Sequence, residues 1–163
     1  MSVNKYRPHV FVLPEDDANR QLANGFHLEL ASIRQMQVER PAGGWNEVLK
    51  LFEEEHVFEM DRCDNRYMVL LIDFDGIEDR LQLAKERIPD RLADRVFIFG
   101  ARTTPEALRH ALREAGLDSF ENIGKGLAED CRNGTETVWA HPLLQHNAEE
   151  VERSRQHLLP ILL

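Results

Sequence analysis

Two carboxylates, Asp73 and Asp75, stand one residue apart directly after an apolar run at residues 67–72. The run is too short for a stable helix and is apolar on both faces, which predicts a buried central strand of a parallel sheet. Because alternate strand residues point the same way, we expect both carboxylates to project together past the end of this strand. Oxygen ligands of this kind suit Mg²⁺, and Mn²⁺ is an alternative. The plainer interpretation is a pair of carboxylates that cap the following helix.

A second acidic cluster, Glu15, Asp16 and Asp17, follows an apolar run at residues 9–13 that predicts the first strand. Ligands of open α/β sheets bind at the carboxyl ends of the strands. We therefore expect Glu15 to be a metal ligand or the general acid/base, and Asp16 or Asp17 to recruit a second metal ion. The alternative is that these residues cap a helix and add solubility.

The elements that must position these residues alternate between strand and helix patterns. Strands are predicted at residues 9–13, 35–40, 67–72 and 96–99, with a fifth, edge-like strand at 135–140. Helical spacing occurs at 22–33, 45–52, 77–88, 105–115 and 149–159. This alternation predicts an α/β fold: a mostly parallel sheet of four to five strands with helices on both faces. We expect a single domain over residues 1–163, with a core at about 8–115 and a strand and helix extension at 116–163.

Particular residues mark the ends of these helices. Asp16 or Asp17 is expected to cap the first helix, and Thr103 or Thr104 the helix that begins near Pro105. Gly116 has the position of a glycine C-cap. Residues 120–131 keep helical spacing, but Gly124 and Gly126 flank Lys125 and leave a loop open as the alternative.

Composition narrows the class of protein. The chain has 163 residues, a net charge of −9 and only two cysteines, which have no metal-ligand spacing. There is no apolar signal region and no apolar stretch of about 18 residues, so we expect a soluble, cytoplasmic protein with no membrane partner. The acidic charge disfavours a domain that grips nucleic acid alone, because Lys and Arg supply most non-specific binding. A polynucleotide substrate would need bridging metal ions or a partner protein.

The order of these motifs resembles that of Toprim domains. Glu15 follows the first strand, Gly43 and Gly44 follow the second, and Asp73-Phe74-Asp75 follows the third, so the resemblance covers roughly residues 8–115. Toprim domains occur in topoisomerases, primases, recombination proteins and nucleases of the OLD (overcoming lysogenisation defect) family. The chain most resembles small stand-alone Toprim proteins and the OLD-type nuclease module. The resemblance implies Mg²⁺-dependent phosphodiester hydrolysis within a multi-protein system such as bacterial antiviral defence or DNA repair, with an ATPase encoded nearby as a partner.

The resemblance also implies roles for residues outside the acidic clusters. Gly43 and Gly44 would let the backbone approach a substrate phosphate, which Arg102 would also contact. Lys125 is the match to a late lysine of the OLD-type modules. One departure is that Glu15 is followed by Asp16, where many Toprim domains have glycine.

Two other functions remain open. One alternative to the nuclease is a non-catalytic Toprim-like regulatory or assembly subunit. The other is a receiver-like phosphoacceptor domain, because residues 13–20 resemble the acidic first segment of such a domain. Against the receiver, the third strand ends in Asp-x-Asp, and Gly100-Ala101-Arg102 stands after the fourth strand with no lysine.

Overall fold

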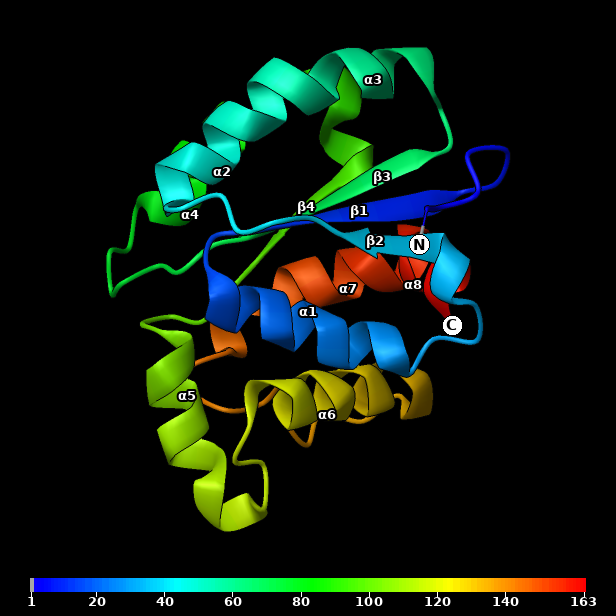
Figure 1. Ribbon diagram of the computed structural model, residues 1–163. Helices are drawn as coiled ribbons and strands as arrows, with labels where there is room; N and C mark the ends of the chain where they lie inside the picture. Colours follow the sequence, from blue (N-terminus) through cyan, green and yellow to red (C-terminus); the bar gives the residue numbers. More distant parts are fainter. Residues whose placement is uncertain (1) are drawn as a thin grey trace.

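The fold is α/β, with four parallel strands and helices packed around them (Figure 1). The computed structural model describes residues 2–163. The strands are β1 (His9–Pro14), β2 (Met36–Val38), β3 (Arg66–Leu71) and β4 (Val96–Phe99), in the order β2-β1-β3-β4. The predicted fold class is therefore confirmed.

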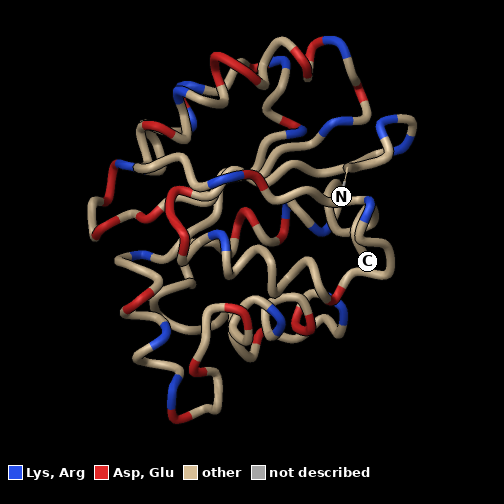
Figure 2. Tube along the Cα trace, in the orientation of Figure 1, with Lys and Arg blue, Asp and Glu red and all other residues tan. Residues whose placement is uncertain are grey.

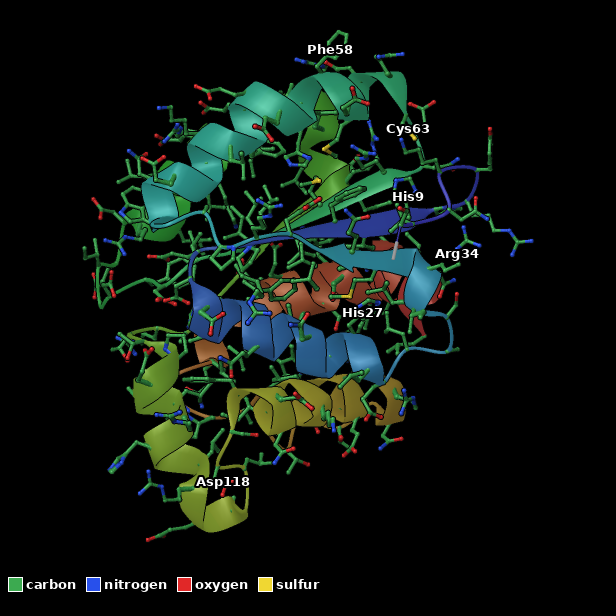
Figure 3. All side chains as sticks on the ribbon, viewed as in Figure 1. His9, His27, Arg34, Phe58, Cys63 and Asp118 are labelled. Carbon is green, nitrogen blue, oxygen red and sulfur yellow. The ribbon has the colours of Figure 1, made fainter. Side chains whose placement is uncertain are left out.

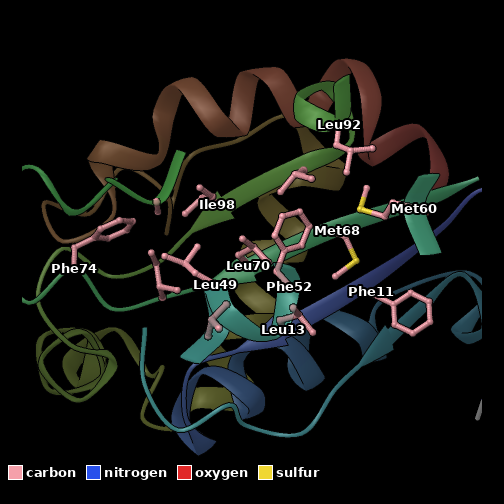
Figure 4. Packing of buried hydrophobic residues seen from close by; sticks show 14 of the residues in the cluster. Phe11, Leu13, Leu49, Phe52, Met60, Met68, Leu70, Phe74, Leu92 and Ile98 are labelled. Carbon is pink, nitrogen blue, oxygen red and sulfur yellow. The ribbon is translucent and has the colours of Figure 1, made fainter. Parts of the chain in front are cut away.

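One face of the sheet is covered by helices α2 (Trp45–Leu51), α3 (Val57–Arg62) and α4 (Arg80–Glu86), together with a π-helical turn (Phe52–His56) that joins α2 to α3. Alternate strand residues, such as Phe11 and Leu13 of β1, point into this layer. There they pack on Leu49, Phe52 and Met60, as Figure 4 shows. Burial of each such side chain contributes about 1.5–3 kcal/mol.

The other face is covered by α1 (Asp17–Leu28), α7 (Ala148–His157) and α8 (Leu159–Leu162). Helices α5 (Pro105–Leu112) and α6 (Phe120–Asn133) lie on the far side of α1 from the sheet (Figure 1). Helix α6 packs closely on α1, where an added Cβ at Gly25 or at Gly124 would overlap a backbone carbonyl oxygen of the other helix. Short 3₁₀ turns complete the chain at Ile33–Gln35, Asp90–Arg95, Arg113–Ala115 and Gln145–Asn147.

Three predicted helix ends are confirmed. Asp16 caps α1 by accepting a hydrogen bond from the Asn19 backbone N–H at 2.9 Å. Thr104 caps α5 in the same way, with Ala107 N–H as the donor at 3.2 Å. Gly116 has the left-handed φ of 83° typical of a glycine C-cap. Residues 120–131 are helical, so the loop alternative around Lys125 is wrong.

The fifth strand predicted at 135–140 is wrong. This segment forms turns around the buried carboxylate of Asp130, which accepts hydrogen bonds from the Thr135 hydroxyl and from the backbone N–H groups of Thr137, Val138 and Trp139. Burial alone would raise the pKa of Asp130, but these hydrogen bonds hold it below its usual value. The carboxylate thus satisfies backbone groups that a neighbouring strand would otherwise bind.

Two predicted helices are shorter than their apolar spacing suggests. Helix α1 ends at Leu28, and Ile33 is 45% exposed. Helix α4 begins at Arg80, because residues 77–79 do not take helical structure, and Ile77 is 45% exposed. Within residues 2–163, none of the helices is long and apolar enough to cross a membrane.

Candidate functional site

The register of the sheet brings the two acidic clusters together. Pro14 of β1 pairs with Leu71 of β3, and the Glu15 N–H donates to the Leu71 carbonyl at 2.9 Å. The connections from β1 and β3 run to opposite edges of the sheet, so the strand order reverses between them. Ligands of open α/β sheets bind at the carboxyl ends of strands at such a switch point. Glu15, Asp16 and Asp73 all lie there.

A network of hydrogen bonds holds these three residues together. One Glu15 carboxylate oxygen accepts from the Asp73 backbone N–H at 2.6 Å. The Asn19 side-chain amide nitrogen donates both to Asp73 Oδ1, at 2.9 Å, and to Asp16 Oδ1, at 3.0 Å. A neutral N–H₂ group therefore bridges two carboxyl groups, as a bound cation would do.

This arrangement changes the acidity of the carboxyl groups. Asp73 is only 6% exposed, and burial, together with the nearby charges of Glu15 and Asp16, raises its pKa to about 8 although the Asn19 hydrogen bond opposes this shift. Burial also raises the pKa of Glu15, while the Asp73 backbone N–H lowers it. Burial and the neighbouring carboxyl groups therefore favour the protonated form of Asp73 while no cation is bound.

Asp75 lies beside this cluster and is paired with Arg80, and its charge contributes to the raised pKa of Glu15. The sequence predicts that it projects beside Asp73, but β3 ends at Leu71 and Asp75 takes a left-handed φ of 49°. Its Oδ2 accepts a hydrogen bond from Arg80 Nη1 at 2.6 Å, and the same nitrogen donates to the Asp73 carbonyl at 2.7 Å. The Arg80 guanidinium also lies 4.6 Å from the centre of the Trp45 ring, which fixes it in place.

The glycines, Arg102 and Lys125 occupy different places. Gly43 adjoins the cluster, because its N–H donates to the Glu15 carbonyl at 2.9 Å, and its φ of 100° favours glycine. Gly44 starts α2. Arg102 lies at the same edge, where its carbonyl accepts from Gly76 N–H at 2.8 Å and its side chain is exposed. Lys125 is not brought to the cluster: it lies on α6, where its Nζ is 3.6 Å from a carboxylate oxygen of Glu121.

The resemblance to Toprim domains depends on these residues alone. No protein-family model, curated protein or solved structure matches the chain. What the structure establishes is an α/β fold on four parallel strands, with acidic residues at the β1/β3 switch point. The Toprim assignment therefore stays a proposal.

Asn19 and Arg80 contact Asp73, and His146 packs against the adjacent Phe74, but none of the three is among the candidates drawn from the sequence. His146 packs edge-on against Phe74, with ring centres 4.9 Å apart, and neither of its buried ring nitrogens has a hydrogen-bond partner. The sequence gives one weak indication of Asn19. If Asp16 caps the first helix, its side chain binds the backbone N–H three residues later, which belongs to Asn19. For Arg80 and His146 we find no signal, since their contacts depend on the turns at 75–76 and 141–147.

The carboxyl cluster is not a preformed metal cage. Within residues 2–163, no group of three or more His, Cys, Asp and Glu side chains has the arrangement of a metal site. Asp17 is directed elsewhere and binds Arg20 and Gln21. A cation shared by Asp16 and Asp73 would take the place of the Asn19 amide between them.

The pKa of Asp73 predicts a particular dependence of stability on pH. Its value in the folded protein, about 8, lies above its usual value of 3.8, so the folded state binds more protons between these limits. The contribution of Asp73 to stability is therefore present below about pH 4 and is lost as the pH rises towards 8. We expect Asp73→Asn to be more stable than wild type at pH 8 by on the order of 5 kcal/mol, and the difference to shrink towards pH 4.

Urea denaturation of both proteins from pH 4 to pH 8, in buffers free of divalent cations, measures this difference. The buried histidines are the same in wild type and in Asp73→Asn. Their effect on the free energy of unfolding therefore cancels in the difference between the two proteins. A stability difference that does not change with pH would contradict the assigned protonation of Asp73.

Proposed function

We propose that the protein hydrolyses phosphodiester bonds in DNA or RNA with Mg²⁺, and that Asp16 and Asp73 bind the ion with Glu15 beside them. The observation that supports this most is the convergence of three carboxyl groups from the ends of β1 and β3, where burial, together with the charges of Glu15 and Asp16, raises the pKa of Asp73 to about 8. A divalent cation would offset this repulsion and release the Asp73 proton. Mn²⁺ would serve the same oxygen ligands.

Each residue near the cluster has a role in this proposal. The bound cation would lower the pKa of a water molecule and neutralise charge on the phosphate. Glu15, with its raised pKa, would act as general acid/base. Arg80 binds the Asp75 carboxylate, which would be a further ligand of the cation if this pair opened, and carries a buried positive charge beside the cluster. Gly43 leaves space for a phosphate next to Glu15, since nothing lies within 4 Å of where a Cβ would stand.

Binding of a polynucleotide needs help from outside the chain. The net charge is −9, and the loop after β3 carries several acidic residues (Figure 2), of which Glu78 and Asp79 are exposed close to Asp75 in the sequence. We therefore propose a Toprim-like subunit that works with a basic partner protein. An ATPase encoded by a neighbouring gene would match the OLD-type systems that the chain resembles.

A cleavage assay tests the proposal. We expect the purified protein, alone or with the product of its neighbouring gene, to nick supercoiled plasmid or to cut RNA when Mg²⁺ or Mn²⁺ is present. Excess EDTA should abolish the reaction, and added Mg²⁺ should restore it. Absence of cleavage of either polymer under all these conditions would contradict the proposal.

The strand order favours a second candidate, a receiver-like phosphoacceptor. Flavodoxin-like domains, which include a receiver, share the order 2-1-3-4 in their first four strands. Asp73 would then accept a phosphoryl group with Asp16 beside it. Against this, β4 is followed by Gly100, and within residues 2–163 there is no fifth strand to carry a lysine to the site.

Incubation with acetyl phosphate and Mg²⁺ separates the two candidates. A phosphoryl group on Asp73, detected by mass spectrometry, would support the receiver, and an unmodified protein that cleaves nucleic acid would support the nuclease. If neither reaction occurs but a partner complex survives Glu15→Ala with Asp73→Ala, the chain is a non-catalytic assembly subunit.

A further inference from the structure

An apolar cavity of about 110 Å³ lies between the sheet and the helices that cover its α1 side. Residues of all four strands supply one wall, and residues of helices α1, α5, α6, α7 and α8 supply most of the others. Protein interiors leave few voids larger than a water molecule, so a cavity of this size is a distinct feature. Residues that represent its walls are Val12, Val69, Ala23, Leu127, Cys131 and Leu162.

The polar side chains at the edges of the cavity already make hydrogen bonds within the protein. The Asn19 amide binds Asp16 and Asp73, and the Ser154 hydroxyl donates to the Val151 carbonyl. The Asn147 side chain accepts from Gly100 N–H and donates to the carbonyls of Gly100 and Leu144. A buried water needs two to four polar partners, so these walls are poor ligands for water. They suit a molecule without hydrogen-bonding groups.

We propose that this cavity binds a small neutral apolar molecule, the size of a benzene ring or a short hydrocarbon chain. An apolar cavity of about 150 Å³ in another protein stays dry and takes up benzene or xenon, which sets the scale. The occupant gains van der Waals contacts that the facing side chains lack while the space is empty. Its place is notable because Asn19 both borders the cavity and holds the Asp16 and Asp73 carboxyl groups.

The two free cysteines provide a direct test. Cys131 lines the cavity, whereas Cys63 follows α3 near the far end of β3 (Figure 3) and does not. We expect saturating benzene to slow the modification of Cys131 by methyl methanethiosulfonate several-fold, with no change at Cys63, as followed by peptide mass spectrometry. Equal rates at Cys131 with and without benzene would overturn the proposal.

A cavity-filling variant gives the matched comparison. Ala23→Leu places a larger side chain in the cavity, and Ala31→Leu makes the same change at an exposed position. With benzene at about five times its Kd, we expect the Tm of wild type and of Ala31→Leu to rise by about 2–4 °C. We expect no rise for Ala23→Leu, and an equal rise there would overturn the proposal.

If Ala23→Leu does not fold, protection of Cys131 in wild type decides the matter. Both experiments are done without divalent cations and without nucleic acid. Their failure would therefore leave the proposed cation chemistry unaffected, and failure of the cleavage assay would not count against the cavity.

Discussion

Asp73→Asn is expected to reduce metal-dependent cleavage by at least about 100-fold, since loss even of residues that only orient a ligand costs 10–100-fold. Asp73 is the carboxyl group that Asn19, Glu15 and Asp16 all surround, and its side chain is 6% exposed. An asparagine has the same shape and can accept the same hydrogen bond from Asn19, so the fold should persist. Nicking rates measured at saturating Mg²⁺ and at saturating Mn²⁺ give the size of the effect.

Asp79→Asn is the matched control, because it makes the same chemical change at an exposed carboxylate later in the same loop. We expect it to keep the wild-type rate. Cleavage by Asp73→Asn at the wild-type rate would show that Asp73 takes no part in the reaction. It would therefore contradict the proposed site.

Gly124→Ala is expected to destabilise the protein by about 3 kcal/mol or more, at the upper end of the usual cost of overpacking. The new Cβ would overlap the carbonyl oxygen of Leu22 and come within 3.0 Å of Phe26 N. Both atoms belong to the backbone of α1, so relief requires the two helices to move apart. Urea denaturation followed by circular dichroism measures the loss of stability.

Gly126→Ala is the control within the same helix. There the nearest atoms to an added Cβ are side-chain carbons, Val138 Cγ2 at 3.0 Å and Leu117 Cδ1 at 3.7 Å. These side chains can shift, and alanine favours a helix over glycine by about 1 kcal/mol. We expect Gly126→Ala to remain within about 1 kcal/mol of wild type. Equal losses for the two variants would contradict the close packing of α6 on α1.

The parts of the fold that the sequence predicts well are those set by local pattern. Strands β1, β3 and β4 are short, apolar on both faces and bounded by polar or turn residues, so their position and parallel pairing follow from composition. That in turn places Glu15 and Asp73 at one edge of the sheet. The caps formed by Asp16 and Thr104 are equally local, because each binds an N–H group three residues later.

The parts of the fold that the sequence predicts poorly depend on tertiary contacts. Residues 135–140 have the composition of a strand, but the Asp130 carboxylate takes their N–H groups. Gly124 lies in a helix because it must pack against the backbone of α1, a reason that no sequence pattern shows. The pairing of Asp75 with Arg80 follows from the left-handed φ of Asp75 and from the position of Arg80, and neither shows in the sequence pattern. The match of Lys125 to a motif carried no information about where its helix packs.

Calorimetric titration with Mn²⁺ and Mg²⁺ tests most directly whether the carboxyl groups of Asp16 and Asp73 share a cation. At pH 7, below the pKa of about 8 for Asp73, binding should release a proton, so the measured heat should depend on the ionisation enthalpy of the buffer. We predict saturable binding with this buffer dependence in wild type, and loss of both in Asp73→Asn. Isotherms that are the same for the two proteins would contradict the site.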